Sequence, residues 1–254
     1  MTVSRIGYYG KLPARADFVS RRLPEDFIKP WDVWIQSALS AGESWSGEFW
    51  RQRFLASPTW RFALPAGTCG RAGWTGVLRP SMDAVGRCFP FVLAAELPRA
   101  ADIFTVMDAG TGWFERLEAM AGAIARPDFE LDWLDRPLPS LRSAAGGQTR
   151  WPSLGAAHSG KLWHELPSIL AVTVALRRQP MSARAASGRD AAIWWTAGTT
   201  AVASGVAVTL GLIPPAAFPA LIDGSWGDHG WMVTDGTALA KDPDPVPLEW
   251  DRTA

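Results

Sequence analysis

A polar loop between two apolar segments holds the residues of this sequence that are best suited to chemistry: Ser81, Asp83 and Arg87. A hydroxyl, a carboxylate and a guanidinium at this spacing suit the binding of a partner or an anionic group, since Arg forms bidentate hydrogen bonds. They also suit a phosphate-handling hydrolase. The structural alternative is that Asp83 and Arg87 only pair with each other or cap backbone groups, with Gly86 at a positive φ in a turn. The residues alone leave these uses open.

Other catalytic and cofactor-binding motifs are missing from the sequence. Its three histidines, His158, His164 and His229, form no HExxH metal motif, and the chain has no CxxC pair, GxSxG elbow or dinucleotide-binding glycine motif. Gly10 and Lys11 do not make a phosphate-binding P-loop, because the required glycine spacing is absent and no Ser or Thr follows the lysine. We therefore predict no cofactor, no metal and no enzymatic activity.

The cysteines leave one enzymatic alternative. Cys88 and a histidine brought together in space would form a nucleophile and its base. Cys88 begins an apolar segment, however, where a thiol behaves as a small hydrophobic group. Cys69 and Cys88 are too few for a disulfide framework in a chain of this size, so we expect both to be reduced.

Two strand-like segments must position the polar loop. Residues Trp74 to Leu78 precede it, and the apolar segment Cys88 to Glu96 follows it. An almost unbroken apolar run of this length predicts a strand that is covered on both faces. Trp60 to Leu64 is a further strand at short spacing, so we expect an antiparallel meander. The sequence thus places the loop at one end of two central strands.

Strands and helices alternate irregularly along the chain, which predicts an α/β fold with a mixed sheet and helices on both faces. Further strands are predicted at Arg5 to Tyr9, Ile169 to Leu176 and Ala191 to Thr196. Helices are predicted from Phe27 with Gly42 as the end, over GEFWRQRFL after a Ser46 cap, over Trp113 to Ile124, and from Pro215 with Gly224 as the end. We expect a single domain of residues 1–254 with an irregular excursion at about 128–153, although a domain linker would have the same composition.

Composition and charge exclude several classes of protein. The 254 residues carry 25 basic and 25 acidic side chains, so the formal net charge is zero and no block of one sign marks a nucleic-acid-binding surface. An apolar content of 48% supports a sizeable core, in which we expect most of the 15 tryptophans. No secretory signal is visible and no apolar stretch is long enough to span a membrane, so we expect a cytoplasmic protein without membrane insertion.

Three motifs together resemble the TagF family, also called ImpM, of bacterial proteins associated with type VI secretion. They are GYYGKLPARADFVSRRLP at residues 7–24, GVLRPSMDAVGRCFPF at 76–91, and WWTAG at 194–198 with GLIPPAAF at 211–218. Their order and spacing extend the resemblance over nearly the whole chain. Ala16 departs from the family, which usually has glycine before the Asp-Phe pair.

The resemblance implies a three-layer α/β/α domain and a cytoplasmic accessory protein that represses type VI secretion after translation. The partner it implies is a secretion-system component such as the forkhead-associated scaffold protein, whose phosphorylation a kinase and a phosphatase control. A structural accessory subunit of the apparatus is the other role we consider. Both motif loops follow strands, so we expect them at the same edge of the sheet. The residues predicted to bind the partner are Lys11, Asp17, Ser81, Asp83, Arg87 and Trp195.

Overall fold

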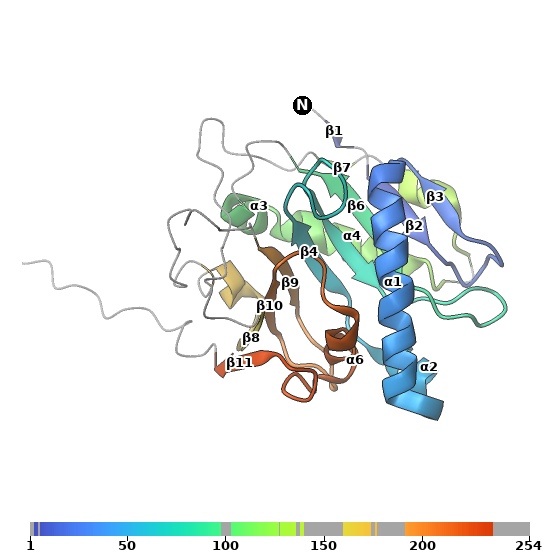
Figure 1. The fold of residues 1–254 in the computed structure, drawn as a ribbon. Helices are drawn as coiled ribbons and strands as arrows, with labels where there is room; N and C mark the ends of the chain where they lie inside the picture. Colours follow the sequence, from blue (N-terminus) through green and yellow to red (C-terminus); the bar gives the residue numbers. More distant parts are fainter. Residues whose placement is uncertain are drawn as a thin grey trace, which may run out of the picture.

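A nine-stranded sheet forms the centre of the molecule (Figure 1). The computed structural model describes residues 3–4, 6–97, 103–126, 128–135, 138–139, 160–173, 176 and 191–235. His158 and residues 136–137 and 140–153 of the predicted excursion lie outside these ranges. The strand order is β11-β8-β10-β9-β4-β5-β6-β2-β3, and all neighbours are antiparallel except β11 and β8. The strands are β2 (Gly7–Gly10), β3 (Val19–Arg21), β4 (Trp60–Leu64), β5 (Trp74–Arg79), β6 (Phe91–Glu96), β8 (Lys161–Glu165), β9 (Ala192–Thr196), β10 (Gly205–Thr209) and β11 (Met232–Asp235), while β1 (Val3–Ser4) pairs separately with β7 (Leu138–Pro139).

Helices cover both faces of this sheet (Figure 1). One layer contains α1 (Glu25–Ser46), α2 (Trp50–Ala56) and α6 (Ala220–Asp223), and the other contains α3 (Ile103–Ala109) and α4 (Thr111–Ala123). The 3-10 helices are η1 (Gly47–Phe49), η2 (Leu131–Asp135), η3 (Ile169–Ala171) and η4 (Pro215–Ala217). The predicted α/β fold with three α/β/α layers and a mixed, partly antiparallel sheet is therefore confirmed.

Side chains that alternate along the strands divide between two hydrophobic cores. On β9, Trp194 faces the core under α1, where its ring lies 5.5 Å from that of Phe62. Its neighbour Trp195 faces the opposite core, where its ring lies 5.0 Å from that of Phe114 in α4. Most tryptophans of the described residues are buried in one of these cores, as expected.

The centre of the sheet is the predicted antiparallel meander of β4, β5 and β6. All five residues of β4 are buried, because the strand is covered on both faces. β4 also pairs with β9, with Arg61 opposite Trp195 and Ala63 opposite Ile193. This β4–β9 junction joins the strands of the first part of the chain to those of the last.

The predicted end of the first helix was wrong. Helix α1 continues past Gly42 to Ser46. The glycine allows the close packing of a neighbouring side chain and does not end the helix. A Cβ on Gly42 would lie 2.5 Å from the ring of Trp50 in α2. Ser46 does not cap the following segment with its side chain, since η1 continues the helical backbone directly from α1.

The strand predicted at Ile169 to Leu176 was also wrong, because its first residues form η3 and residues 172, 173 and 176 are helical. A continuous apolar run does not distinguish a buried strand from a helix. Val172 and Leu176 are four residues apart and both buried, whereas Leu170 is 72% exposed, which is the pattern of a helix face. By contrast, the short helix after Pro215 and its end at Gly224, in a left-handed conformation with φ of 74°, are confirmed.

Candidate functional site

The two motif loops meet at the end of the sheet where β2 and β5 finish. β2 and β5 are both antiparallel to β6, which lies between them, so they run parallel to each other. Tyr9 of β2 and Leu78 of β5 are both paired with Val92 of β6, so the two strands end at the same level. Loop 11–18 follows β2 and loop 80–90 follows β5, and both emerge on the same side of the molecule (Figure 1). The expected juxtaposition of the loops is confirmed.

Asp83 joins the two loops through its carboxylate. Its Oδ2 accepts hydrogen bonds from Lys11 Nζ at 2.9 Å and Arg87 Nε at 2.6 Å. Its Oδ1 accepts from the backbone N–H groups of Val85 at 3.1 Å and Arg87 at 2.9 Å. The Asp83 side chain is 0% exposed and that of Lys11 is 8% exposed. This is a buried carboxylate whose oxygens are fully occupied by internal donors.

The charge state of Asp83 follows from these contacts. Burial acts to raise the pKa of the Asp83 carboxyl, because desolvation disfavours its charged form. The hydrogen bonds from Lys11 and Arg87 act in the opposite direction and prevail, so the pKa of Asp83 is well below its usual range. The carboxylate is therefore ionised at neutral pH and pairs with the buried Lys11 ammonium.

Further hydrogen bonds fix the two loops against each other. Ser81 Oγ donates to the Lys11 carbonyl at 2.8 Å, and Arg87 Nη2 donates to the Ala16 carbonyl at 2.8 Å. Gly86 has a φ of 84°, as predicted for the turn. Ala16 does not have a positive φ, so the alanine fits the loop although the family usually has glycine there. The predicted internal pairing of Asp83 with Arg87 is present and braces the turn.

The six predicted partner-binding residues separate into three groups. Lys11, Ser81 and Asp83 are brought together but are buried, so they support the loops from within. Asp17 and Arg87 lie on the exposed side of the loops. Trp195 is 3% exposed on β9, which β4, β5 and β6 separate from β2, so it packs in the core and is not brought to the loops.

Two exposed apolar side chains on the loops were not among the predicted partner-binding residues. Phe18 is 45% exposed and Val85 is 66% exposed. The Phe18 ring stacks on Tyr9 with centroids 5.5 Å apart, and Phe89 meets it edge-on at 4.7 Å. The signal that could have found Phe18 is an aromatic residue among charged neighbours in a loop. We refer to Asp17, Phe18, Val85 and the 61% exposed side chain of Arg87 as the paired-loop surface.

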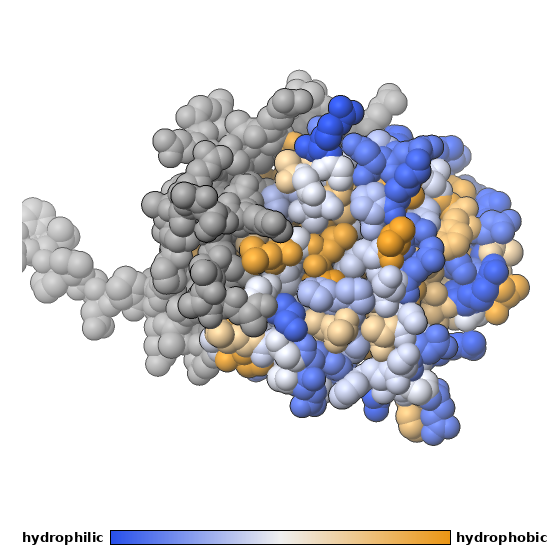
Figure 2. Space-filling view, in the orientation of Figure 1, coloured by the Kyte–Doolittle hydropathy of each residue, from blue (hydrophilic) through white to orange (hydrophobic). Residues whose placement is uncertain are grey.

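A groove of about 340 Å³ lies beside the first of these loops. Arg15 contributes to its lining, and Ala84 of the second loop donates its backbone N–H to the Arg15 carbonyl at 2.9 Å, so the groove adjoins the paired-loop surface. Its wall contains acidic and basic groups together with apolar ones. The lining residues are Leu12, Ala14, Arg15, Arg21, Phe129, Glu130, Leu131 and Asp132. Figure 2 shows apolar residues interspersed with charged ones on the side of the molecule where the loops lie.

The geometry gives no support to a hydrolase built from Ser81, Asp83 and Arg87. Ser81 is 4% exposed, and its hydroxyl proton is donated to the Lys11 carbonyl. Asp83 Oδ2 already accepts from two cationic groups, so it is not free to act as a base.

Among the described residues, no group of three His, Cys, Asp or Glu side chains could hold a metal ion. In the same part of the chain, no helix has the length and hydrophobicity needed to cross a membrane.

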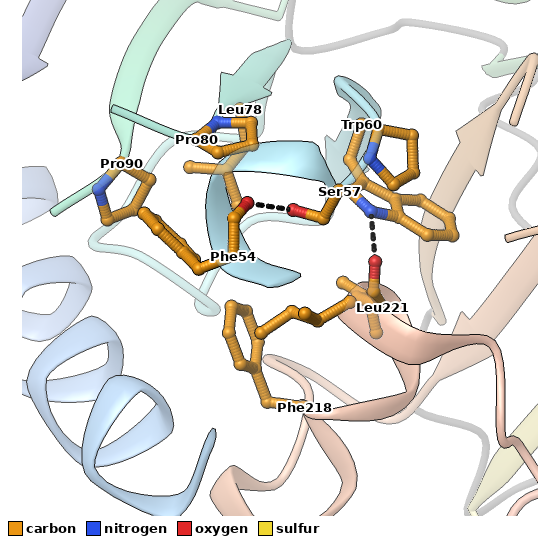
Figure 3. A pocket seen from close by; sticks show the side chains of 10 residues that line it. Phe54, Ser57, Trp60, Leu78, Pro80, Pro90, Phe218 and Leu221 are labelled. Carbon is orange, nitrogen blue, oxygen red and sulfur yellow. Dashed lines mark hydrogen bonds between the residues drawn. The ribbon is translucent and has the colours of Figure 1, made fainter. Parts of the chain in front are cut away.

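A small apolar cleft near the same edge is filled by its own side chains (Figure 3). Its volume of about 10 Å³ is about that of one water molecule, so it offers no room for a substrate. Trp60 Nε1 closes one side by donating to the Leu221 carbonyl at 3.1 Å. Beside it, Ser57 Oγ donates to the Phe54 carbonyl at 2.7 Å (Figure 3). The cleft is thus a packing feature between α2 and α6.

The cysteines are free thiols, and we expect both to react slowly with iodoacetamide at neutral pH. Burial raises the pKa of Cys69 to about 12 and also raises the pKa of Cys88, so little thiolate forms. Mass spectrometry of the native protein should show alkylation at least about tenfold slower than in the denatured chain. Fast alkylation of native Cys88 would instead support the Cys–His alternative.

The described histidines have other partners than a thiol. His229 Nε2 lies 3.2 Å from Asp223 Oδ2, and its ring meets that of Trp45 edge-on at 4.4 Å. His164 Nδ1 contacts the hydroxyl of Thr234. Both contacts join the last described strand and loop to the rest of the molecule.

Comparisons with known proteins identify relatives of this chain. Residues 7–141 match the family described as TagF N-terminal domain, type VI secretion system-associated. The crystal structure of PA0076 from Pseudomonas aeruginosa PAO1 is similar, with 31% sequence identity and a TM-score of 0.64 over 87% of this chain and 94% of that one. The comparison with curated protein sequences gives no match.

Proposed function

Because the chain belongs to the TagF family of type VI secretion-associated proteins, we propose that it represses this secretion system by binding one of its components. In this proposal the protein acts in the cytoplasm, without catalysis, on the forkhead-associated scaffold protein. The observation that carries the proposal is the paired-loop surface, where exposed apolar and charged side chains stand on a rigid, internally bonded frame.

The frame makes the surface suitable for protein recognition. Phe18 is held between Tyr9 and Phe89, and the Tyr9 hydroxyl donates to Asp32 Oδ1 of α1 at 2.7 Å. A side chain that is already ordered loses little conformational entropy on binding. Arg87 adds a guanidinium that is anchored at Nε by Asp83 and exposed beyond it. Aromatic and Arg side chains of this kind are the usual centres of binding energy in protein interfaces.

The buried residues of the motif have a supporting part in this proposal. Lys11 and Asp83 set the distance between the loops, and Ser81 fixes the backbone at Lys11. Lys11 Nζ also lies 5.1 Å from the centroid of the Phe18 ring, so the buried pair and the exposed aromatic are in contact. Substituting these residues would change binding by moving the surface rather than by removing a contact with the partner.

A pull-down against the purified forkhead-associated scaffold protein tests the paired-loop surface. We expect Val85→Asp to weaken capture at least about tenfold, because it places a charge in an apolar part of the interface. Arg87→Ala should weaken capture as well. Val233→Asp is the matched control, because Val233 is 50% exposed on β11. In the strand order, β11 is the outermost strand on the side away from β2 and β3.

Each possible result has a definite meaning. Undiminished capture by both Val85→Asp and Arg87→Ala would eliminate the paired-loop surface. Failure of the wild-type protein to capture the scaffold would eliminate that protein as the partner, and the same variants would then be tested against baseplate proteins. Equal thermal melting of all variants is required for the comparison, since only then does a loss of capture report on the surface.

A further inference from the structure

Another cavity, of about 310 Å³, lies where β5 and β9 end and β4 begins. β5 and β9 are both antiparallel to β4 between them, so their last residues and the first residues of β4 come together. The wall is completed by the end of α2 and by Glu118 of α4, which belong to opposite helical layers. Ser57 and Pro80 also line the cleft of Figure 3, which places the two hollows side by side.

Arg79, the last residue of β5, lines this cavity and has no carboxylate partner within the described part of the chain. It is half-buried, and burial lowers the pKa of its guanidinium because desolvation disfavours the charge. A guanidinium nevertheless stays protonated in proteins. The one hydrogen bond that the Arg79 guanidinium makes within the described ranges goes from Nη1 to Thr59 Oγ1 and is long, at 3.3 Å. No carboxylate oxygen of the described residues lies within ion-pair distance of it.

Glu118 lines the same cavity, but its carboxylate is already paired with Arg61. Arg61 Nε and Nη2 donate to the two oxygens of Glu118 at 2.7 and 2.8 Å, which is a bidentate pair. The Arg61 guanidinium is also held 5.5 Å above the ring of Phe114. The acidic group therefore neutralises Arg61, and Arg79 remains as one uncompensated positive charge facing the cavity.

The hydroxyl groups around the cavity add a donor to this charge. Thr196 Oγ1 is used internally, because it donates to the Thr59 carbonyl at 2.9 Å and accepts from the Gly198 N–H at 3.0 Å. Thr199 Oγ1 accepts from the N–H groups of Ala201 and Val202, which leaves its own proton to donate. A guanidinium and a hydroxyl proton together suit an anion.

We propose that this cavity binds a carboxylate group. The net charge of Arg61, Arg79 and Glu118 is one positive unit, which matches a carboxylate better than a phosphate dianion. Arg79 supplies the fork of N–H donors that a carboxylate accepts, and Thr199 supplies a further donor. The carboxylate belongs either to a free small acid or to an acidic side chain of a partner protein. It can bind whether or not the paired-loop surface contacts a secretion protein.

Nuclear magnetic resonance of the ¹⁵N-labelled full chain tests this site with three probes: acetate, acetyl-Gly-Glu-Gly-amide and the neutral acetyl-Gly-Gln-Gly-amide. We expect saturable shifts of the Arg79 side-chain and Gly198 signals with the two carboxylates and none with the glutamine peptide. Arg79→Gln should weaken binding at least about tenfold, the loss expected for one charge-assisted hydrogen bond. Arg53→Gln, an exposed substitution outside the cavity, should bind as the wild type does.

A second variant keeps the test decisive if Arg79→Gln does not fold. Arg79→Lys retains the charge and loses the planar fork, so it should bind several-fold more weakly than the wild type. Tighter binding of the glutamate peptide than of acetate would assign the carboxylate to a protein side chain, and the reverse order would assign it to a free acid. The absence of saturable shifts with both carboxylates, equal binding of the glutamine peptide, or wild-type affinity in a folded Arg79 variant would each overturn the proposal.

Discussion

Asp83→Ala is expected to lower the melting temperature by about 10 °C, because it removes the acceptor of four hydrogen bonds inside the molecule. Lys11 would remain buried with its charge unpaired, which is the costly part of breaking a buried ion pair. The backbone N–H groups of Val85 and Arg87 would lose their acceptor as well. Thermal melting followed by circular dichroism measures the effect.

Two comparisons separate this effect from a general loss of charge. Asp17→Ala lies on the same pair of loops but is exposed, and it should melt like the wild type. Asp83→Asn keeps the shape and one acceptor oxygen, so its melting temperature should fall between the other two. A wild-type melting temperature for Asp83→Ala would show that the carboxylate does not join the loops in solution.

The same carboxylate should make stability depend on pH in acid. The folded-state pKa of Asp83 is lower than its unfolded value, so its contribution is fully present above the ordinary pKa of about 4. It is lost progressively as the pH falls below that value toward the folded-state pKa. Acid unfolding followed by tryptophan fluorescence should therefore be less steep below pH 4 in Asp83→Asn than in the wild type.

Gly76→Ala is expected to prevent the sheet from forming in its present geometry. Gly76 lies in the middle of β5, opposite Phe62 of β4 and Ala94 of β6. An added Cβ would lie 2.0 Å from the Leu93 carbonyl oxygen and 2.8 Å from Ala94 Cα, and both are backbone atoms of fully buried residues in β6. The strands would have to move apart, at a cost above about 4 kcal/mol in the free energy of unfolding.

A second glycine in the same protein provides the control. Gly112 lies in α4, and nothing is within 4 Å of the position that a Cβ would take. Gly112→Ala should therefore raise the free energy of unfolding by up to about 1 kcal/mol, because alanine favours the helix. Urea denaturation compares the two variants. Unfolding of Gly76→Ala at the wild-type urea concentration would contradict the close contact between β5 and β6.

The meander and the meeting of the two loops were predictable because both follow from local patterns. The apolar segment Cys88 to Glu96 predicted a strand covered on both faces. Both motif loops follow predicted strands, which placed them at the same end of the sheet. The strands β3, β8, β10 and β11 were not predicted. β3 has three residues at the edge of the sheet, and β8 joins the sheet only through β10 and β11, which lie far away in the sequence.

The orientation of the site residues was not predictable from the sequence. Asp83 points inward because Lys11, 72 residues earlier, is placed to meet it, and no local pattern records that contact. Trp195 was predicted to bind the partner because it belongs to the WWTAG motif of the family, not because of its place in a strand. In a strand with helices on both sides, each of two adjacent tryptophans faces a core, so Trp194 and Trp195 are both buried.

The β4–β9 junction has a consequence for the synthesis of the protein. When the ribosome has completed β2 to β6, the free side of β4 has unpaired backbone groups on a strand that is mostly apolar and that is buried throughout in the folded protein. Its pairing partner β9 begins only at Ala192, so the nascent chain waits on the order of ten seconds for it. During that interval the growing polypeptide is open to misassociation with other chains, and a chaperone that shields one strand would be of most use there.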